Sequence, residues 1–104
     1  MYRVEFLPVA KQDLTEIALY IKDKLNNPIA AYNTVEQIVE AAEKLGSFPY
    51  SNPVYTPLRP LKKEYRKIPV KNYMLFYTVD ETEKLITVSR IIYTRRNLSS
   101  QITK

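Results

Sequence analysis

The residues of this chain that could do chemistry are lysines, arginines and tyrosines crowded into its C-terminal half. Residues 53–104 carry eleven Lys and Arg against four Asp and Glu, whereas residues 1–52 carry five against seven. The cations are interleaved with aromatic rings: they are Lys62, Lys63, Arg66, Lys67, Lys71, Arg90, Arg95 and Arg96, and the rings are Tyr65, Tyr73, Tyr77 and Tyr93. Cations bind phosphates and aromatic rings stack on bases, so the pattern predicts a surface for single-stranded nucleic acid or for an acidic protein segment. Ordinary solvated charge and the packing preference of tyrosine for strands are the alternatives.

Several other chemistries are excluded by composition. The chain contains no cysteine and no histidine, which removes disulfides, thiol nucleophiles, zinc-finger ligand sets and the usual general base. We therefore expect no metal and no cofactor. Arg90 lies in an apolar stretch between Val88 and Ile92, where a cation is unfavourable unless it is paired or functional. Its expected contact is Glu64 or another strand carboxylate, or else a ligand.

The first half of the chain predicts a strand followed by two helices. Residues 2–6 alternate apolar and charged side chains, as a half-buried strand does. Residues 9–25 carry one apolar stripe at helical spacing, and Asn27 with Pro28 predicts the N-cap and first position of a second helix. The stripe predicted for this second helix is Ala31, Val35, Ile38, Val39, Ala42 and Leu45, with Glu36, Glu40 and Glu43 opposite. Gly46 is expected to be a left-handed C-cap.

The second half predicts three strands. Residues 47–60 form an irregular connector, for which Phe48, Tyr50 and Val54 are the expected anchors. Strands are predicted over 61–70, 73–79 and 84–93, the first near a sheet edge because Pro69 has no N–H to donate. The whole chain, residues 1–104, is therefore expected to be one α+β domain of order β-α-α-β-β-β, an antiparallel sheet with a two-helix hairpin packed on one face.

No membrane segment is expected. No stretch approaches the roughly 20 apolar residues that a membrane span needs, and no signal peptide follows the N-terminus. The lack of cysteine fits a reducing compartment, and a cytoplasmic location is expected.

One C-terminal segment is a basic Tyr-Arg strand followed by an Asn-Tyr strand that ends in Phe-Tyr (residues 64–80), and another is an arginine-containing strand that closes in Arg-Arg (residues 88–96). Together these two segments resemble the RelE/ParE toxin superfamily. Residues 4–6, Ala10, Asp13-Leu14, Ile17 and Tyr20-Ile21 match the family's first strand and helix as well. The resemblance implies the toxin of a type II toxin–antitoxin, or plasmid-stabilisation, module that arrests growth. It also implies a cognate antitoxin protein as a partner, in a complex that is oligomeric.

The superfamily divides by mechanism, and the resemblance leaves both branches open. RelE-like members cut mRNA in the ribosomal A site without a metal, and on this chain their catalytic positions would be Arg66, Lys67 and Arg95. ParE-like members inhibit DNA gyrase and cut no RNA. Met74 stands where the first branch has an arginine, and Gln101 stands where it has a tyrosine. These replacements favour gyrase inhibition. Binding of the target, or of nucleic acid, is then expected to involve Lys62, Lys63, Arg90, Tyr93 and Arg96.

Overall fold

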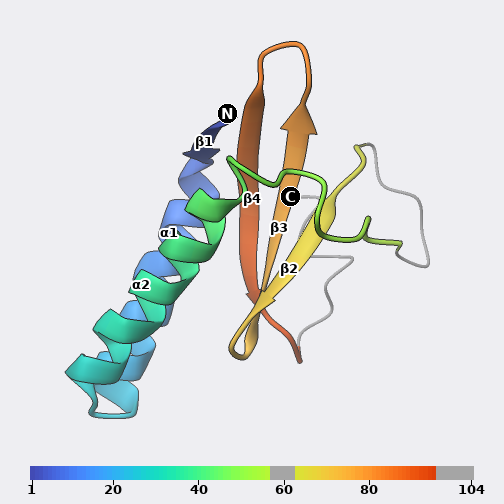
Figure 1. Cartoon of the computed structure of the whole chain (residues 1–104). Helices are drawn as coiled ribbons and strands as arrows, with labels where there is room; N and C mark the ends of the chain where they lie inside the picture. Colours follow the sequence, from blue (N-terminus) through green and yellow to red (C-terminus); the bar gives the residue numbers. More distant parts are fainter. Residues whose placement is uncertain (57–62, 96–104) are drawn as a thin grey trace.

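A four-stranded sheet is covered on one face by a hairpin of two helices (Figure 1) in the computed structural model, which describes residues 1–56 and 63–95. The elements are β1 (Arg3–Phe6), α1 (Pro8–Leu19), the π-helical turn η1 (Tyr20–Lys24), α2 (Pro28–Lys44), β2 (Arg66–Val70), β3 (Tyr73–Asp80) and β4 (Leu85–Tyr93). The α+β class, the order of elements and the helix hairpin on one face are confirmed. No helix in the described ranges is both long and apolar enough to cross a membrane.

The helix hairpin begins and turns at residues whose types fit these positions. Pro8 opens α1 at a position that needs no N–H, and the helix continues into η1. Asn26 adopts a left-handed φ of 55°, which asparagine tolerates better than most residues, and reverses the chain. The side chain of Asn27 accepts a hydrogen bond of 3.0 Å from the backbone N–H of Ala30, so the predicted N-cap of α2 is confirmed.

The sheet has the strand order β1-β4-β3-β2 and is mixed. Strands β2, β3 and β4 are antiparallel neighbours, as expected, whereas β1 pairs parallel to β4. The expectation of a wholly antiparallel sheet was wrong for β1. The reason is the chain path: α1 continues in the direction of β1, and α2, β2, β3 and β4 then reverse in turn, so that β4 runs the same way as β1 (Figure 1).

Strand β2 lies at a sheet edge, as Pro69 predicts. Part of that edge is covered by the connector that follows α2. The N–H of Tyr55 donates to the carbonyl of Tyr65 at 2.8 Å, and the N–H of Lys67 donates to the carbonyl of Pro53 at 3.2 Å. Val54 therefore anchors the connector as expected. Phe48 does not, because 66% of its surface is exposed.

The main core lies between the sheet and the helices. Its largest side chains are Ile38 from α2 and Leu75, Tyr77, Ile86 and Val88 from the sheet, each at most 1% exposed. Val35 and Val39 do not belong to it, contrary to expectation: both are half-buried and neither packs against the core. At 3.6 residues per turn, Val39 lies about 100° around the helix from Ile38. The face of α2 that meets the core is therefore narrower than the stripe of apolar residues in its sequence.

Gly46 has a different role from the one predicted. It does not adopt a positive φ, so it is not a left-handed cap. Its carbonyl accepts a hydrogen bond of 2.9 Å from the N–H of Tyr2, and a Cβ at Gly46 would lie 2.8 Å from the Tyr2 carbonyl oxygen. The missing side chain allows the segment that leads into β1 to approach the end of α2 closely.

Replacing Gly46 by alanine is therefore expected to lower the free energy of unfolding by about 1–3 kcal/mol, as overpacking against a rigid neighbour does. Urea unfolding followed by circular dichroism measures the change. Ser47→Ala, an exposed neighbour, is the matched control and should change little. Equal stability of Gly46→Ala and the wild type would contradict the close approach.

Candidate functional site

Arg90 is buried and bonded to helix α1. Its Nε donates to Asp13 Oδ2 at 2.8 Å and its Nη2 donates to Asp13 Oδ1 at 3.0 Å. Both residues are at most 9% exposed, and the hydrogen bonds to Asp13 raise the pKa of Arg90. The expectation that Arg90 needs a charged contact is confirmed, but Glu64 does not provide it. Placed in this way, Arg90 has little surface left with which to meet a partner molecule.

Strand β4 contains a β-bulge at Ser89, and its edge is left open to α1 where β1 ends. Phe76 pairs with Arg90 while Tyr77 pairs with Val88, so Ser89 is one extra residue in β4. Val88 and Ile92, which simple alternation places on the same face as Arg90, consequently contact different clusters of the core. Beyond Val88, strand β1 no longer pairs with β4, and there the Asp13 carboxylate accepts the N–H of Ile91 at 2.9 Å.

Asp13 is the residue that sequence reasoning missed. It lies on the buried stripe of α1 between Ala10 and Ile17. A carboxylate in such a stripe needs a cation or several N–H donors. This requirement could have identified Asp13 in the sequence. Arg90 also lies among apolar residues and needs an opposite charge, so the two residues could have been matched as an ion pair.

Arg66 lies beneath the connector and holds it. Its Nη1 donates to the carbonyl of Asn52 at 2.8 Å, its guanidinium lies 4.9 Å from the centre of the Tyr50 ring, and Glu64 is 3.9 Å away. Beside it, the hydroxyl of buried Tyr77 donates to the carbonyl of Pro49 at 3.0 Å, and burial raises the pKa of Tyr77. These contacts tie residues 49–52 to the sheet.

Lys67 lies on the other face of the sheet. In the β2–β3 register it is opposite Phe76, whereas Arg66 is opposite Tyr77, and its ammonium lies 5.5 Å from the centre of the Tyr55 ring. Arg66 and Lys67 therefore do not converge on one point.

Three of the remaining predicted site residues, Lys63, Tyr93 and Arg95, lie in the described part of the chain. Lys63 and Arg95 are exposed, and Arg95 follows the end of β4. Tyr93 is 37% exposed and packs edge-on against Tyr73 at 5.9 Å between ring centres. Lys62 and Arg96, like Gln101, lie outside the described residues.

The sheet face opposite the helices carries an apolar cluster. Phe76 and Ile92 are at most 2% exposed there, and Tyr55, Tyr65 and Met74 pack against them. Of the rings predicted for a platform, Tyr77 is buried in the main core and Tyr65 packs against this cluster, so neither presents an open ring for stacking. Met74, which stands where the resemblance to RelE implies an arginine, contributes to this packing.

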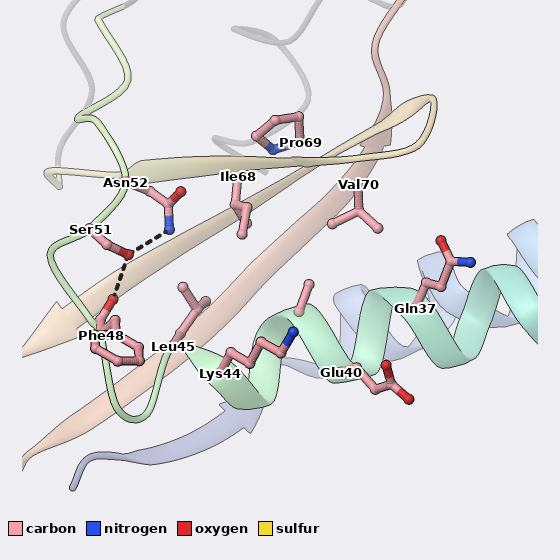
Figure 2. A pocket seen from close by; sticks show the side chains of 11 residues that line it. Gln37, Glu40, Lys44, Leu45, Phe48, Ser51, Asn52, Ile68, Pro69 and Val70 are labelled. Carbon is pink, nitrogen blue, oxygen red and sulfur yellow. Dashed lines mark hydrogen bonds between the residues drawn. The ribbon is translucent and has the colours of Figure 1, made fainter.

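A groove of about 600 Å³ separates α2 from the edge strand β2 (Figure 2). Ile68 and Val70 of β2 point toward the helix, and Phe48, Ser51 and Asn52 of the connector close one end. The residues contributed by α2 and its end are Gln37, Glu40, Ala41, Lys44 and Leu45. Its lining is largely apolar with a few polar groups, as is typical of a surface that receives a peptide segment.

A cluster of polar side chains gathers at the β3–β4 turn. The carboxylate of Glu81 accepts hydrogen bonds from the hydroxyls of Tyr2 and Tyr50 and from the ammonium of Lys84. The hydrogen bonds, first that of Lys84, lower the pKa of Glu81 to about 2, and the one from Tyr50 raises the pKa of that tyrosine to about 12. The cluster joins the N-terminus, the connector and the turn.

This cluster predicts a distinct acid response. Because the pKa of Glu81 is lower in the folded chain than in the unfolded one, its stabilising effect is complete above the unfolded value near 4.5 and is lost as the pH falls toward 2. Between those limits the stability of the wild type should fall more steeply than that of Glu81→Gln. Urea unfolding at a series of pH values measures both slopes. Glu83→Gln, an exposed neighbour, should follow the wild type, and parallel curves for Glu81→Gln would contradict the prediction.

The side-chain groupings that hold metal ions are absent from the described part of the chain. Over residues 1–56 and 63–95, no three or more acidic side chains gather in a way that could hold an ion. The lining of the groove and the exposed cations are among the described residues that can bind a partner.

The chain matches one family model and several solved structures. The model is described as the ParE toxin of the type II toxin–antitoxin system parDE, and it matches residues 4–98. The fold is similar to a structure of the chromosomal ParDE toxin–antitoxin system from P. aeruginosa, with a TM-score of 0.74 and 21% identity over 91% of this chain and 98% of the other. Comparison with the sequences of curated proteins finds no significant match.

Two RelE-type structures share the fold as well. The RelBE2 complex from Mycobacterium tuberculosis has a TM-score of 0.64 and 22% identity over 88% of this chain and 96% of the other. The archaeal RelE-RelB complex from Pyrococcus horikoshii has a TM-score of 0.60 and 17% identity over 92% and 98%. At these identities the likeness concerns the fold alone.

Proposed function

Because the chain belongs to the ParE toxin family of type II toxin–antitoxin systems, we propose that it arrests growth by inhibiting DNA gyrase, as the ParE branch does. The observation that favours gyrase inhibition over RNA cleavage is the orientation of Arg66 and Lys67. They lie on opposite faces of the sheet, and each contacts the connector. A ribonuclease of the RelE type would need them to act on one phosphate.

The chemistry of RNA cleavage supports the same choice. Attack by a 2′-hydroxyl requires a base, an acid for the leaving oxygen and cations on the phosphate. The chain has no histidine, and Met74 cannot supply the missing guanidinium. Glu64, the carboxylate beside the basic strand, is exposed and lies 3.9 Å from Arg66, as in a surface ion pair.

The experiment compares the two targets directly. Purified toxin is added to a gyrase supercoiling assay, and separately to a translating extract whose messenger RNA is analysed by primer extension. We expect supercoiling to be inhibited at micromolar toxin, restored by the antitoxin, and no codon-dependent breaks to form. Undiminished supercoiling would overturn the proposal, and breaks at codon boundaries would establish the RelE-like alternative.

We propose further that the cognate antitoxin occupies the groove between α2 and β2 with an amphipathic segment that folds on binding. The outward edge of β2 offers few positions for an added strand. Residues 53–55 already pair with its first part, and Pro69 has no N–H. A helix laid along the apolar lining avoids that restriction.

Variants of the groove test this placement. Ala41→Arg is expected to weaken antitoxin binding by about thirtyfold, because a long cation would fill the space that the apolar segment needs, an effect of about 2 kcal/mol. Isothermal titration calorimetry with the purified antitoxin measures the change. Leu19→Ala, an exposed apolar residue outside the groove, is the matched control, and unchanged affinity of Ala41→Arg would place the antitoxin elsewhere.

A further inference from the structure

Helix α2 carries a second apolar strip that faces away from the core. Ile29 and Tyr32 are 74% and 67% exposed, and Val35 and Val39 are half-buried without packing against the core. These four residues recur at three- or four-residue intervals over about 15 Å of helix. Apolar side chains in a continuous strip on a surface helix are typical of a contact with another helix.

Three carboxylates border this strip. Glu36, Glu40 and Glu43 line a shallow hollow of about 350 Å³ together with Tyr32, Val35 and Val39. None of the ion pairs found among the described residues involves these glutamates. These three carboxylates give the hollow a negative potential. A hydrogen bond to Glu36 and the negative charges of Glu36 and Glu40 also raise the pKa of Tyr32.

The arrangement is unfavourable for the isolated helix. Glu36 and Glu40 are four residues apart and Glu40 and Glu43 are three apart, which brings like charges together on one side of α2. The chain as a whole has a net charge of +5, so an acidic patch here is not a consequence of overall composition. A cationic partner would relieve the repulsion and cover the strip at the same time.

We propose that the outer face of α2, from Ile29 to Glu43, binds an amphipathic helix of a protein partner whose apolar residues are flanked by lysine or arginine. A second copy docked through the same face would set glutamates against glutamates. Acidic antitoxin segments, nucleic acids and anionic membranes would be repelled in the same way. The hollow and the groove proposed for the antitoxin share only Glu40 among their lining residues, so both surfaces can be occupied at once.

The proposal does not depend on the identity of the toxin's target. It is tested with two synthetic helical peptides of identical apolar pattern, one with flanking lysines and one with flanking glutamates. Binding to the purified toxin–antitoxin complex is measured by fluorescence anisotropy, and the contact is mapped by amide chemical shifts. We expect the lysine peptide to bind at least about tenfold more tightly than the glutamate peptide, with shifts centred on Val35 and Val39.

Charge reversal provides the decisive comparison. The double variant Glu36→Lys with Glu43→Lys should weaken binding of the lysine peptide by at least about tenfold and strengthen binding of the glutamate peptide. Both positions are exposed on a helix, so circular dichroism should show an unchanged fold. Glu83→Lys, an exposed carboxylate at the β3–β4 turn, is the control and should bind as the wild type does.

Three results of the peptide experiments would overturn the proposal. They are equal affinity for the two peptides, chemical shifts centred outside α2, and no effect of the double charge reversal. Self-association of the wild type that is lost in Tyr32→Ser would also overturn it, because the face would then serve a second copy. None of these results bears on gyrase inhibition, which is tested separately.

Discussion

Replacing Asp13 by alanine is expected to lower the free energy of unfolding by about 3–5 kcal/mol, because it leaves a buried guanidinium without its carboxylate. Asp13 accepts two hydrogen bonds from Arg90 and one from the N–H of Ile91, all between 2.8 and 3.0 Å. The exposed fraction of Arg90 is only 8%, so water can replace little of what is lost. A domain of this size typically has 5–15 kcal/mol of stability, and the variant should therefore be close to unfolding at growth temperature.

Urea unfolding followed by circular dichroism measures the loss, and two further variants interpret it. Asp23→Ala removes an exposed carboxylate in η1 and should change stability by no more than about 0.5 kcal/mol. Asp13→Leu combined with Arg90→Met removes the two charges together and should recover most of the stability, since an apolar pair can replace a buried ion pair. A loss below about 1 kcal/mol in Asp13→Ala would mean that the pair contributes little.

Phe76→Ala is expected to destabilise the chain by a similar amount, about 3–5 kcal/mol, although Phe76 lies on the sheet face away from the helices. The side chain is fully buried, and its ring packs edge-on against Tyr55 at 5.0 Å between ring centres. Ile92 is buried beside it, and Tyr65 and Met74 pack against both. Removing the ring would leave a cavity in this cluster and abolish the aromatic contact.

The control is the same substitution at an exposed ring. Phe48 is 66% exposed, so Phe48→Ala should change the free energy of unfolding by no more than about 0.5 kcal/mol. Thermal unfolding measures both variants. Similar small effects would show that the outer face of the sheet is an open surface and would reinstate the platform of cations and rings that the sequence predicts.

Local features of the fold could be predicted because they depend on residues near one another in the chain. Asn27 and Pro28 identify the start of α2, and Pro69 identifies an edge strand, through the hydrogen bonds that each residue can or cannot make. The strand and helix patterns predicted the order of elements for the same reason. The errors at Val35 and Val39 arose because apolar character alone does not tell which helix face meets the core.

The candidate site was predicted less well than the fold, because its arrangement depends on contacts between distant residues. The extra residue Ser89 in β4 interrupts alternation, so the faces assigned to Arg90 and its neighbours could not be derived from spacing. Arg66 and Lys67 are consecutive in β2 and lie on opposite faces, as alternation along a strand requires. Their contacts with the connector could not be predicted, since the connector has no periodic pattern that places it beside β2.

The sequence by itself determined the family, the α+β class and the concentration of cations in the C-terminal half, because these follow from residue types and short-range spacing. Tertiary structure alone decided which charged side chains remain on the surface, where a partner can bind them. It brings Asp13 to Arg90 across 77 positions of sequence. It also packs aromatic residues into the cluster around Phe76, and it leaves exposed the glutamates that border the apolar strip of α2. A charge becomes part of a core or of a surface through the elements that pack around it, and that packing depends on the path of the whole chain.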